Sequence, residues 1–283
     1  MRPNSPLRLR SSAVLATLLV ILMGSGMAAA RAAQPGNAAM ADEPAAPGAA
    51  AALDPGVMRE MREVRAVPEV RDPRDDATDA ALRALRPHVR RSSEPEALRR
   101  AFRAYYSYRL ANAALVTKPY LYYVDLGLDN ATARGWVFDM ESLSLVDGPF
   151  HVAHGTGSSR TRNGVPTRFS NVPGSKASSL GLYLAEETYA FSGRSAGGAY
   201  RSVGLRLRGE SGAFNDAARA RGIVAHGAPY VSSRDAGRSE GCPAMEQHRA
   251  QRLLHMLSNG GVVFIFSPND AGWLQADPWL NAE

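Results

Sequence analysis

The stretch Arg-Ser-Glu-Gly-Cys-Pro-Ala at residues 238–244 contains the single cysteine of the chain, and it follows Ile-Val-Ala-His-Gly at residues 223–227. His226 precedes Cys242 by sixteen positions. A thiol, an imidazole that can take its proton, and glycines that let a substrate approach the backbone are the minimum set for cysteine acyl chemistry. The alternative is a buried, inert cysteine, because cysteine is among the residue types most often buried. The surrounding sequence has to distinguish these two interpretations.

The residues next to the cysteine favour a reactive thiol. Pro243 follows Cys242 directly, and proline is preferred at the first position of a helix, so we expect a helix over residues 244–258. Its free N–H groups and dipole would stabilise a thiolate and hold an oxyanion. Gly241 leaves room for a substrate beside the backbone. His226 ends a predicted strand and would act as general base, then as general acid.

The N-terminus has the layout of a secretory signal peptide. Three arginines precede an uncharged apolar run at residues 13–23, and the small residues 28–30 fit an A-x-A cleavage site. The run is shorter than the roughly 20 residues that a membrane span needs. We therefore expect residues 1–30 to be removed, the protein to be exported to the periplasm or cell envelope, and no membrane span to remain; a retained anchor is the alternative. An idle free thiol is a liability there, which favours a functional Cys242.

Composition and charge give no sign of nucleic-acid binding. The formal net charge of +6 falls to about +3 without residues 1–30, and basic residues are scattered rather than grouped with aromatic ones. His151 and His154 are three positions apart, so on a strand they would point to opposite faces. We expect no metal, no other cofactor and a monomer.

The chain divides into regions of different composition. Residues 31–94 are rich in Ala and Pro and then in charges, and we expect a flexible segment there. Two short helices are expected within it: 58–67 and 79–85. Apolar residues recur at spacings of three and four over residues 95–116, which predicts an amphipathic helix that docks on the domain. The domain is expected at residues 95–268, with a C-terminal tail at 269–283.

Beyond Lys118-Pro119 the pattern becomes rich in β structure. Apolar or alternating runs are bounded by turn-forming residues, which is typical of short strands. The predicted strands are 120–126, 134–139, 149–153, 179–184, 203–208, 223–226 and 262–266. A short helix is expected at residues 214–221. The predicted fold class is mainly β with a few helices.

Several motifs resemble a known family. His226-Gly227 followed by Ser239-Glu240-Gly241-Cys242 is similar to the signature of murein L,D-transpeptidase catalytic domains, the YkuD-like group. Further similar motifs extend the resemblance over residues 98–268 in the same order: Val-Ala-His-Gly-Thr-Gly (152–157), Phe-Ser-Asn-Val-Pro-Gly-Ser (169–175), Ser-Ser-Leu-Gly-Leu-Tyr (178–183) and Phe-Asn-Asp (214–216). One branch of the family ends its catalytic motif in Gly-Cys-Pro-Ala, as this chain does.

The resemblance implies a YkuD-like β-sandwich or partial barrel, preceded by an N-terminal helix. It also implies acyl transfer on peptidoglycan stem peptides. Cys242 would attack meso-diaminopimelate in a tetrapeptide and release D-Ala, and the thioester would pass to a neighbouring stem as a 3–3 cross-link. By the same resemblance His226 would be the base, Ser239 would help to orient it, and Gly241 would shape the oxyanion site. Carbapenems acylate enzymes of this group.

One position departs from the wider group. Most members carry Arg or Asn two positions after the cysteine, and this chain has Ala244. Substrate contacts must then come from elsewhere, and we expect Arg238, Gly227 and His154 to contribute them. Arg238 could equally be an exposed loop arginine, and His154 a hydrogen-bonded structural histidine.

Two other functions stay open from the sequence. An L,D-carboxypeptidase would use the same thioester with water as acceptor, and a non-catalytic envelope protein would bind peptidoglycan without turning it over. Papain-like endopeptidases are disfavoured, because their cysteine precedes their histidine along the chain.

Overall fold

The computed structural model describes residues 71–281, within the unit Arg65–Glu283. The expected signal peptide, the Ala- and Pro-rich stretch and the helix expected at residues 58–67 lie outside the described residues.

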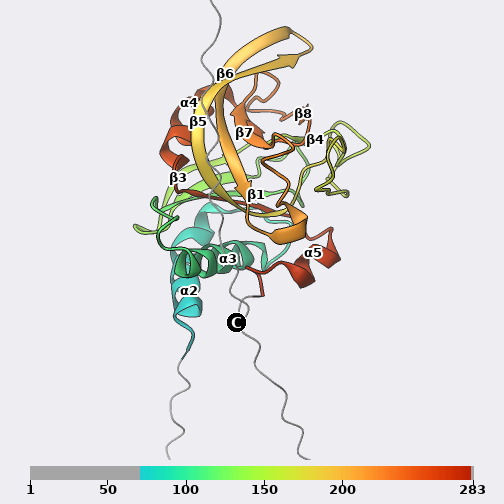
Figure 1. Ribbon diagram of the computed structural model, residues 1–283. Coiled ribbons are helices and arrows are strands. Elements are labelled where there is room, and N and C mark those ends of the chain that lie inside the picture. The colour runs from blue at the N-terminus through green and yellow to red at the C-terminus, as the bar shows by residue number, and fades with distance from the viewer. Residues whose placement is uncertain (1–70, 282–283) are drawn as a thin grey trace, which may run out of the picture. The chain divides into compact units, whose positions relative to one another are not determined.

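A curled sheet, open on one side as a half-barrel, forms the body of the described part of the chain (Figure 1). Among residues 71–281 it has eight strands in the order β3-β2-β1-β10-β5-β6-β7-β9. Their bounds are β1 Tyr120–Asp125, β2 Gly135–Asp139, β3 Ser144–Phe150, β5 Gly181–Ser195, β6 Gly198–Gly209, β7 Val224–Gly227, β9 Ala244–Met245 and β10 Val262–Phe266. β4 (His154–Gly155) and β8 (Arg238–Ser239) pair as a second, small sheet. The predicted class, mainly β with a few helices, is confirmed.

Helices cover this sheet. They are α2 Pro73–Leu85, α3 Ala97–Ala111, α4 Gln247–Leu257 and α5 Ala271–Ala276, with short 3-10 turns η1 Arg86–His88 and η2 Gly212–Phe214. Helix α3 packs under β1 and β10, and α4 packs on β6 and β7. Figure 1 shows α2 and α3 together on one side of the sheet, with the long β5–β6 hairpin curling away from them.

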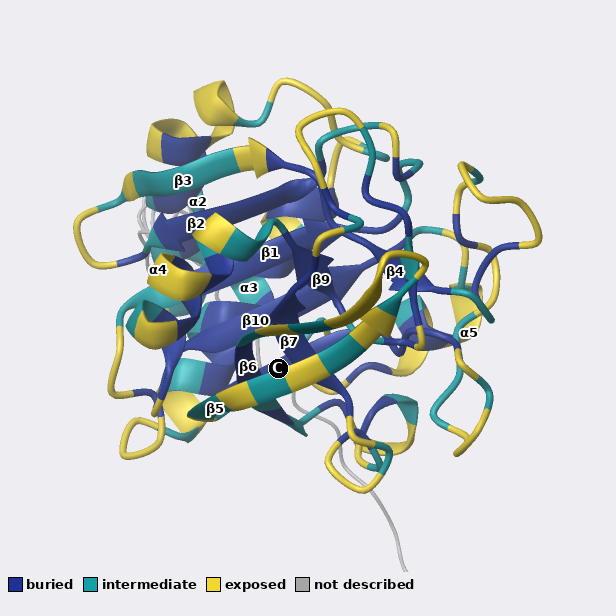
Figure 2. Ribbon diagram, turned by 90° about the horizontal axis from the view of Figure 1, so that it is seen from above, coloured by how far each residue is buried: buried dark blue, intermediate teal, exposed yellow. Residues whose placement is uncertain are grey.

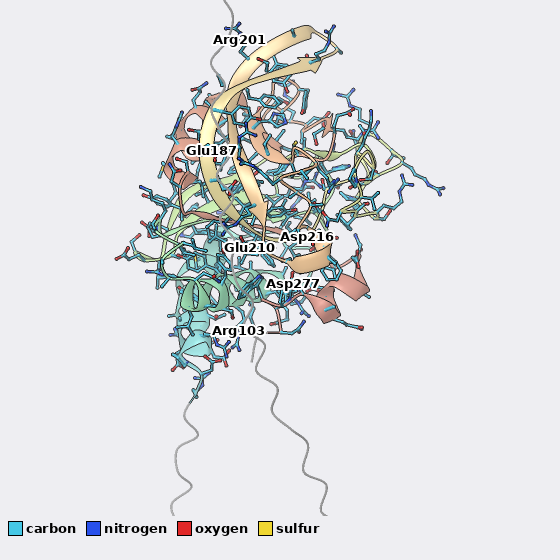
Figure 3. All side chains as sticks on the ribbon, in the orientation of Figure 1. Arg103, Glu187, Arg201, Glu210, Asp216 and Asp277 are labelled. Carbon is cyan, nitrogen blue, oxygen red and sulfur yellow. The ribbon has the colours of Figure 1, made fainter. Side chains whose placement is uncertain are left out.

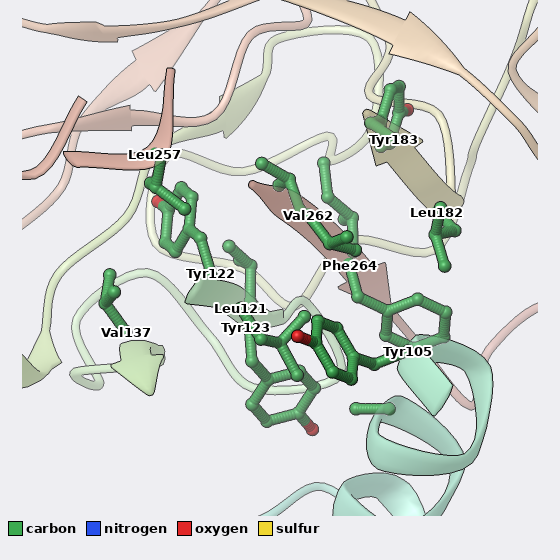
Figure 4. Packing of buried hydrophobic residues seen from close by; sticks show 14 of the residues in the cluster. Tyr105, Leu121, Tyr122, Tyr123, Val137, Leu182, Tyr183, Leu257, Val262 and Phe264 are labelled. Atoms are coloured by element: carbon green, nitrogen blue, oxygen red, sulfur yellow. The ribbon is translucent and has the colours of Figure 1, made fainter. Parts of the chain in front are cut away.

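The core lies where α3 meets the central strands. All five residues of β10 are buried, as expected for a strand covered on both faces. Figure 2 shows β1, β2 and β10 in the buried colour, whereas the far part of β5 alternates between exposed and intermediate residues. In Figure 4, Tyr105 of α3 packs beside Leu121 and Tyr123 of β1 and Phe264 of β10. The helix expected at residues 95–116 is thus the element that closes this core, although its Leu110 is 66% exposed.

The flexible segment expected up to residue 94 ends earlier in the structure. Helix α2 begins at Pro73 because Asp72 caps it, accepting a hydrogen bond from Arg74 N at 2.8 Å. The acidic face of α2 pairs with α3, where Arg103 (Figure 3) contacts Asp72 and Asp75. The charge run therefore holds one helix against another instead of facing solvent on all sides.

The expected C-terminal tail is also partly structured. Trp273 of α5 is fully buried, and its ring lies 5.7 Å from Phe266 and 6.0 Å from Phe264. Its indole N–H donates to Asp277 at 2.8 Å (Figure 3). Trp273 and Asp277 thus tie this segment to the core of the domain.

Two expected elements differ in kind or extent. Strands β5 and β6 run on through residues 185–202 to form a long hairpin that the sequence analysis did not predict. The helix expected at residues 214–221 is a series of turns after η2. Asn215 explains the turns, because its side chain accepts from Ser211 N at 2.8 Å and donates to Leu182 O at 2.9 Å. This side chain ties the loop to β5 instead of letting the backbone continue as a helix.

Candidate active site

Cys242 does not lie at a helix N-terminus, so that prediction is wrong. Ala244 and Met245 form β9, which runs parallel to β7, and α4 begins only at Gln247. Ala153 N donates to Ala244 O at 2.8 Å on the other side of β9. Backbone pairing on both sides holds this segment extended, and the helix dipole is no source of thiolate stabilisation.

One pocket of about 260 Å³ contains both Cys242 and His226. Its other lining residues are Thr156, Phe191, Gly193, Arg194, Tyr200, Tyr230, Arg238, Ser239 and Glu240. The pocket lies between the β5–β6 hairpin, the end of β7 and the β8 segment. Residues far apart along the chain thus form one cleft around the thiol and the imidazole.

The surroundings of His226 define its proton state. The ring is almost fully buried and stacks on Phe191, with centroids 4.2 Å apart and planes at 18°. Its Nδ1 lies 3.1 Å from Gly227 O, and because a carbonyl only accepts, Nδ1 carries the proton. Burial lowers the pKa of His226 to about 4, partly offset by the Gly227 hydrogen bond. At neutral pH the ring is neutral, and its Nε2 can accept a proton.

The Cys242 thiol is protonated in the resting protein. Its side chain is partly exposed, and Sγ donates to Gly222 O at 3.8 Å. Desolvation in its packed surroundings raises the pKa of the thiol above its usual value, while the Val224 N–H and the Arg221 guanidinium act to lower it. A neutral thiol and a neutral imidazole therefore share the pocket.

Ser239 stabilises the turn that carries Cys242. Its hydroxyl donates to Cys242 O at 2.6 Å and accepts from Gly241 N at 3.2 Å. Among the described residues it makes no hydrogen bond to His226. The carbonyl of Gly227, rather than Ser239, orients the imidazole.

Gly241 occupies a position that admits no side chain. Its φ is +124°, and an added Cβ would lie 2.9 Å from Ile223 Cδ1 and 3.0 Å from Ala177 O. Its carbonyl accepts from Ser178 Oγ at 3.0 Å. Glycine is thus required for the conformation that presents Cys242.

Of the three expected substrate-binding residues, the structure places Arg238 alone in the pocket lining. Its guanidinium donates to Ser159 O at 3.3 Å. His154 is fully buried, and its Nδ1 accepts from Arg134 Nη2 at 2.8 Å. Burial first, then Arg134 and Arg238, lowers the pKa of His154 to about 3. His154 therefore follows the structural alternative, and its expected place in the cleft is wrong.

Gly227 is buried and is not among the residues that line the pocket. An added Cβ there would meet Ser202 Oγ at 2.3 Å, Ala250 Cβ at 2.8 Å and Gln247 Cα at 2.9 Å. Its Cα side faces β6 and α4, and it lets these elements pack closely against β7.

The aromatic wall of the pocket was not predicted from the sequence. Phe191 and Tyr200 come from the β5–β6 hairpin, and Tyr230 packs edge-on against Tyr200 with centroids 6.4 Å apart. The alternation Thr-Tyr-Ala-Phe-Ser at residues 188–192 was the available signal, because it has the period of a strand.

Within residues 71–281, no three His, Cys, Asp or Glu side chains gather as a metal site would require. The helices of that part are all too short or too polar to cross a membrane.

Several solved structures are similar to this chain at low sequence identity. Among solved structures, the chain is similar to an L,D-transpeptidase from Mycobacterium smegmatis, with 14% identity, 53% of this chain and 59% of that chain covered, and a TM-score of 0.32. It is also similar to one from Stackebrandtia nassauensis, with 15% identity, coverage of 69% and 80%, and a TM-score of 0.32. A third similar structure is that of the Ldtfm-avibactam carbamoyl enzyme. The identity is 13%, the match covers 53% of this chain and 49% of that chain, and the TM-score is 0.32.

The chain spans about half of the Ldtfm chain and three fifths of the Mycobacterium smegmatis one. No curated protein matches the chain in sequence. The family model described as the L,D-transpeptidase catalytic domain matches residues 90–266, which is more than half of the chain. The protein belongs to the family of L,D-transpeptidase catalytic domains.

Proposed function

We propose that this protein is an L,D-transpeptidase that forms 3–3 cross-links between peptidoglycan stem peptides through a thioester on Cys242. The observation that carries the proposal is the shared pocket of Cys242 and a neutral His226 whose Nε2 is available to the thiol proton. Family membership supports the reaction class.

The first half of the reaction forms the acyl-enzyme. The Cys242 Sγ–H proton passes to His226 Nε2 as sulfur attacks the carbonyl carbon of the meso-diaminopimelate L-centre in the donor tetrapeptide. The C–N bond to D-Ala then breaks, and the departing amine takes the proton from His226. The products are free D-Ala and a thioester on Cys242.

The second half transfers the acyl group. The side-chain amine of a neighbouring stem attacks the thioester carbonyl and gives a proton to His226. The C–S bond breaks, a new amide bond forms, and the proton returns to Cys242.

The backbone around the cysteine supplies an oxyanion donor. Gly241 N–H is committed to Ser239 Oγ. Among the described residues the Cys242 N–H donates to no acceptor, so it is free to bind the negative oxygen of the tetrahedral intermediate. Ser239 fixes this N–H in place by holding both ends of the turn.

Other lining residues suit a stem peptide. Phe191, Tyr200 and Tyr230 give apolar faces for its aliphatic side chains. Arg238 and Arg194 place positive charge where the carboxylates of the stem would lie. Because the predicted signal peptide directs export, we assign the activity to the periplasm or cell envelope.

The test is incubation of the purified protein with disaccharide-tetrapeptide, followed by mass spectrometry. We expect a 3–3 dimer and free D-Ala. Tripeptide alone would show an L,D-carboxypeptidase, with water as acceptor. No product, together with no carbapenem adduct on Cys242, would overturn both enzymatic assignments.

The matched controls are Cys242→Ser and Cys242→Ala. Both should keep the circular dichroism spectrum of the wild type and lose the dimer. Full activity in either variant would show that another residue is the nucleophile.

A further inference from the structure

We infer that Arg221 is a positioning residue for the proposed reaction, supplying the fixed positive charge that stabilises the Cys242 thiolate. The importance of this charge for catalysis rests on the proposed function, whereas its effect on the thiol can be measured without any substrate. Arg221 takes the place that the sequence analysis gave to a helix dipole.

The guanidinium of Arg221 is held rigidly. It donates four hydrogen bonds to one loop, residues 170–179: to Ser170 O at 2.7 Å, Ala177 O at 2.8 Å, Ser175 Oγ at 3.1 Å and Ser179 Oγ at 3.1 Å. A planar guanidinium held by several acceptors cannot swing away into solvent. Its charge therefore stays at one point of the fold.

All four acceptors are neutral, so the charge is not compensated. Within residues 71–281 no carboxylate forms an ion pair with Arg221. Arg219, only two positions earlier, contrasts with it, because Arg219 pairs with Glu186 at 2.6 Å and Glu187 at 3.2 Å. Burial lowers the pKa of Arg221, yet guanidinium groups remain charged in proteins. A half-buried cation without a counter-ion stabilises an anion that forms near it.

The residues that follow Arg221 in the chain contact the sulfur of Cys242. Gly222, the next residue, accepts the thiol hydrogen bond at 3.8 Å. The backbone N–H of Val224 acts on the same sulfur and favours its thiolate form. Residues 221–224 therefore supply a charge, an acceptor and a donor that all act on the Cys242 thiol.

The loop that anchors Arg221 also contacts the turn that carries Cys242. Ser178 Oγ donates to Gly241 O at 3.0 Å, and Ala177 O lies 3.0 Å from the place of an added Gly241 Cβ. Ala177 O thus faces both the guanidinium and the residue before the nucleophile. The loop that holds the Arg221 guanidinium therefore also packs against the residue that precedes Cys242.

Other ionisable groups near the thiol do not provide this charge. His226 is neutral at pH 7. Glu240 opposes the thiolate and is itself paired with Lys176 at 3.0 Å. Four tyrosines also interact electrostatically with the thiol. Burial is the main cause that raises the pKa of each, so that they stay neutral: Tyr183, Tyr189, Tyr200 and Tyr230. Arg194 is exposed to solvent, which screens its charge. Arg238 is half-buried, like Arg221, but it is not among the groups that act on the pKa of the Cys242 thiol.

The experiment measures the thiol itself. Cys242 is the single cysteine, so the rate of its alkylation by iodoacetamide against pH, followed by mass spectrometry, gives one thiol pKa. We expect Arg221→Gln to raise that pKa by about one unit and to slow alkylation at pH 7 about tenfold. Arg221→Lys should fall between Arg221→Gln and the wild type. Arg219→Gln, the matched control, should have the wild-type profile.

A wild-type pH profile in a folded Arg221→Gln protein would overturn the inference, because a purely structural arginine would not move the thiol pKa. If Arg221→Gln does not fold, the double variant Ser175→Ala/Ser179→Ala is used, which removes two anchors and keeps the charge. It should raise the thiol pKa by a smaller amount than a full unit, and an unchanged value there would equally refute the inference.

Failure of the proposed function is distinguishable from failure of this inference. A shifted thiol pKa in Arg221→Gln, with no acyl transfer by the wild type, would remove the proposed function and leave the role of Arg221 intact. Dimer formation by the wild type, with an unshifted pKa in Arg221→Gln, would do the reverse.

Discussion

His226 lies directly opposite Ala244 in the parallel pair of β7 and β9. This register places His226 beside the strand that begins two residues after Cys242. Ala244 has a packing role, because its side chain is fully buried in a cluster with Ala153, Ala228 and Ala236. The position at which the wider group has Arg or Asn therefore faces a packed cluster of small residues.

Ala244→Arg should consequently destabilise the protein without adding a substrate contact. An arginine there would bury an unpaired charge and overfill the small-residue cluster, at a cost of about 3 kcal/mol or more. Urea unfolding measures this cost, and Ala244→Ser, with one extra atom, is the control that should lose far less. A stable Ala244→Arg protein with higher transfer activity would contradict the packing role.

His226→Gln should lower the rate of Cys242 acylation by a carbapenem about 10²- to 10⁴-fold, the usual contribution of a general base. The thiol would then have no neutral acceptor for its proton in the pocket. His248→Gln, at a side chain that is 73% exposed, is the control and should react like the wild type. Equal acylation rates in all three proteins would remove His226 from the mechanism.

Stability should fall as the pH drops from 6.5 towards 4. The pKa is about 4 for His226 and about 3 for His154 in the folded state, below the usual 6.5, so over this range the unfolded chain binds protons that the folded protein does not. The stability is therefore complete above pH 6.5 and is lost on acidification, by about 2 kcal/mol per histidine between pH 7 and pH 5.

Urea unfolding at pH 7 and pH 5 checks this dependence. His226→Gln and His154→Gln should each remove one histidine's share of the difference. The expectation fails if both variants keep the full wild-type difference between the two pH values.

Gly241→Ala should impair both folding and acylation. The φ of +124° and the contacts of an added Cβ with Ile223 and Ala177 O combine to cost about 2 to 4 kcal/mol. Gly174→Ala separates the two causes, since Gly174 has a φ of +76° and nothing within 4 Å of an added Cβ. Its cost should be about 1 kcal/mol. Thermal denaturation of both variants measures the difference, and equal costs would mean that crowding at Gly241 is unimportant.

Phe191→Ala should raise the pKa of His226 towards its ordinary value. The stacked ring excludes water from one face of the imidazole, and desolvation is the main cause of the lowered pKa. Histidine ring resonances in an NMR titration report this shift, and Phe191→Tyr should keep the wild-type value. An unshifted His226 in Phe191→Ala would assign the desolvation to other neighbours.

Elements with a strong pattern of their own were predictable from the sequence. The apolar run Val262–Phe266 is the buried strand β10, and the aromatic spacing after residue 95 is helix α3. Such patterns indicate which face of a segment is buried, because the spacing of apolar residues within the segment itself defines that face. Cys242 and His226 were predicted as nucleophile and base from residue chemistry and the order of motifs, and the structure places both in one pocket.

Pairing between distant segments decided the rest. Residues 244–245 became a strand instead of a helical turn, because β7 offered them backbone partners. His154 is buried and accepts a hydrogen bond from Arg134, twenty positions earlier in the chain, so it does not line the cleft. The loop at residues 170–179 gave Arg221 its four neutral acceptors.

The order of motifs and the hydrophobic patterns were thus enough to predict the β-rich family fold and to nominate Cys242 and His226 as candidate nucleophile and base. The tertiary structure alone decided what surrounds them, since burial, charge compensation and hydrogen-bond partners depend on residues that are close in space and remote in sequence.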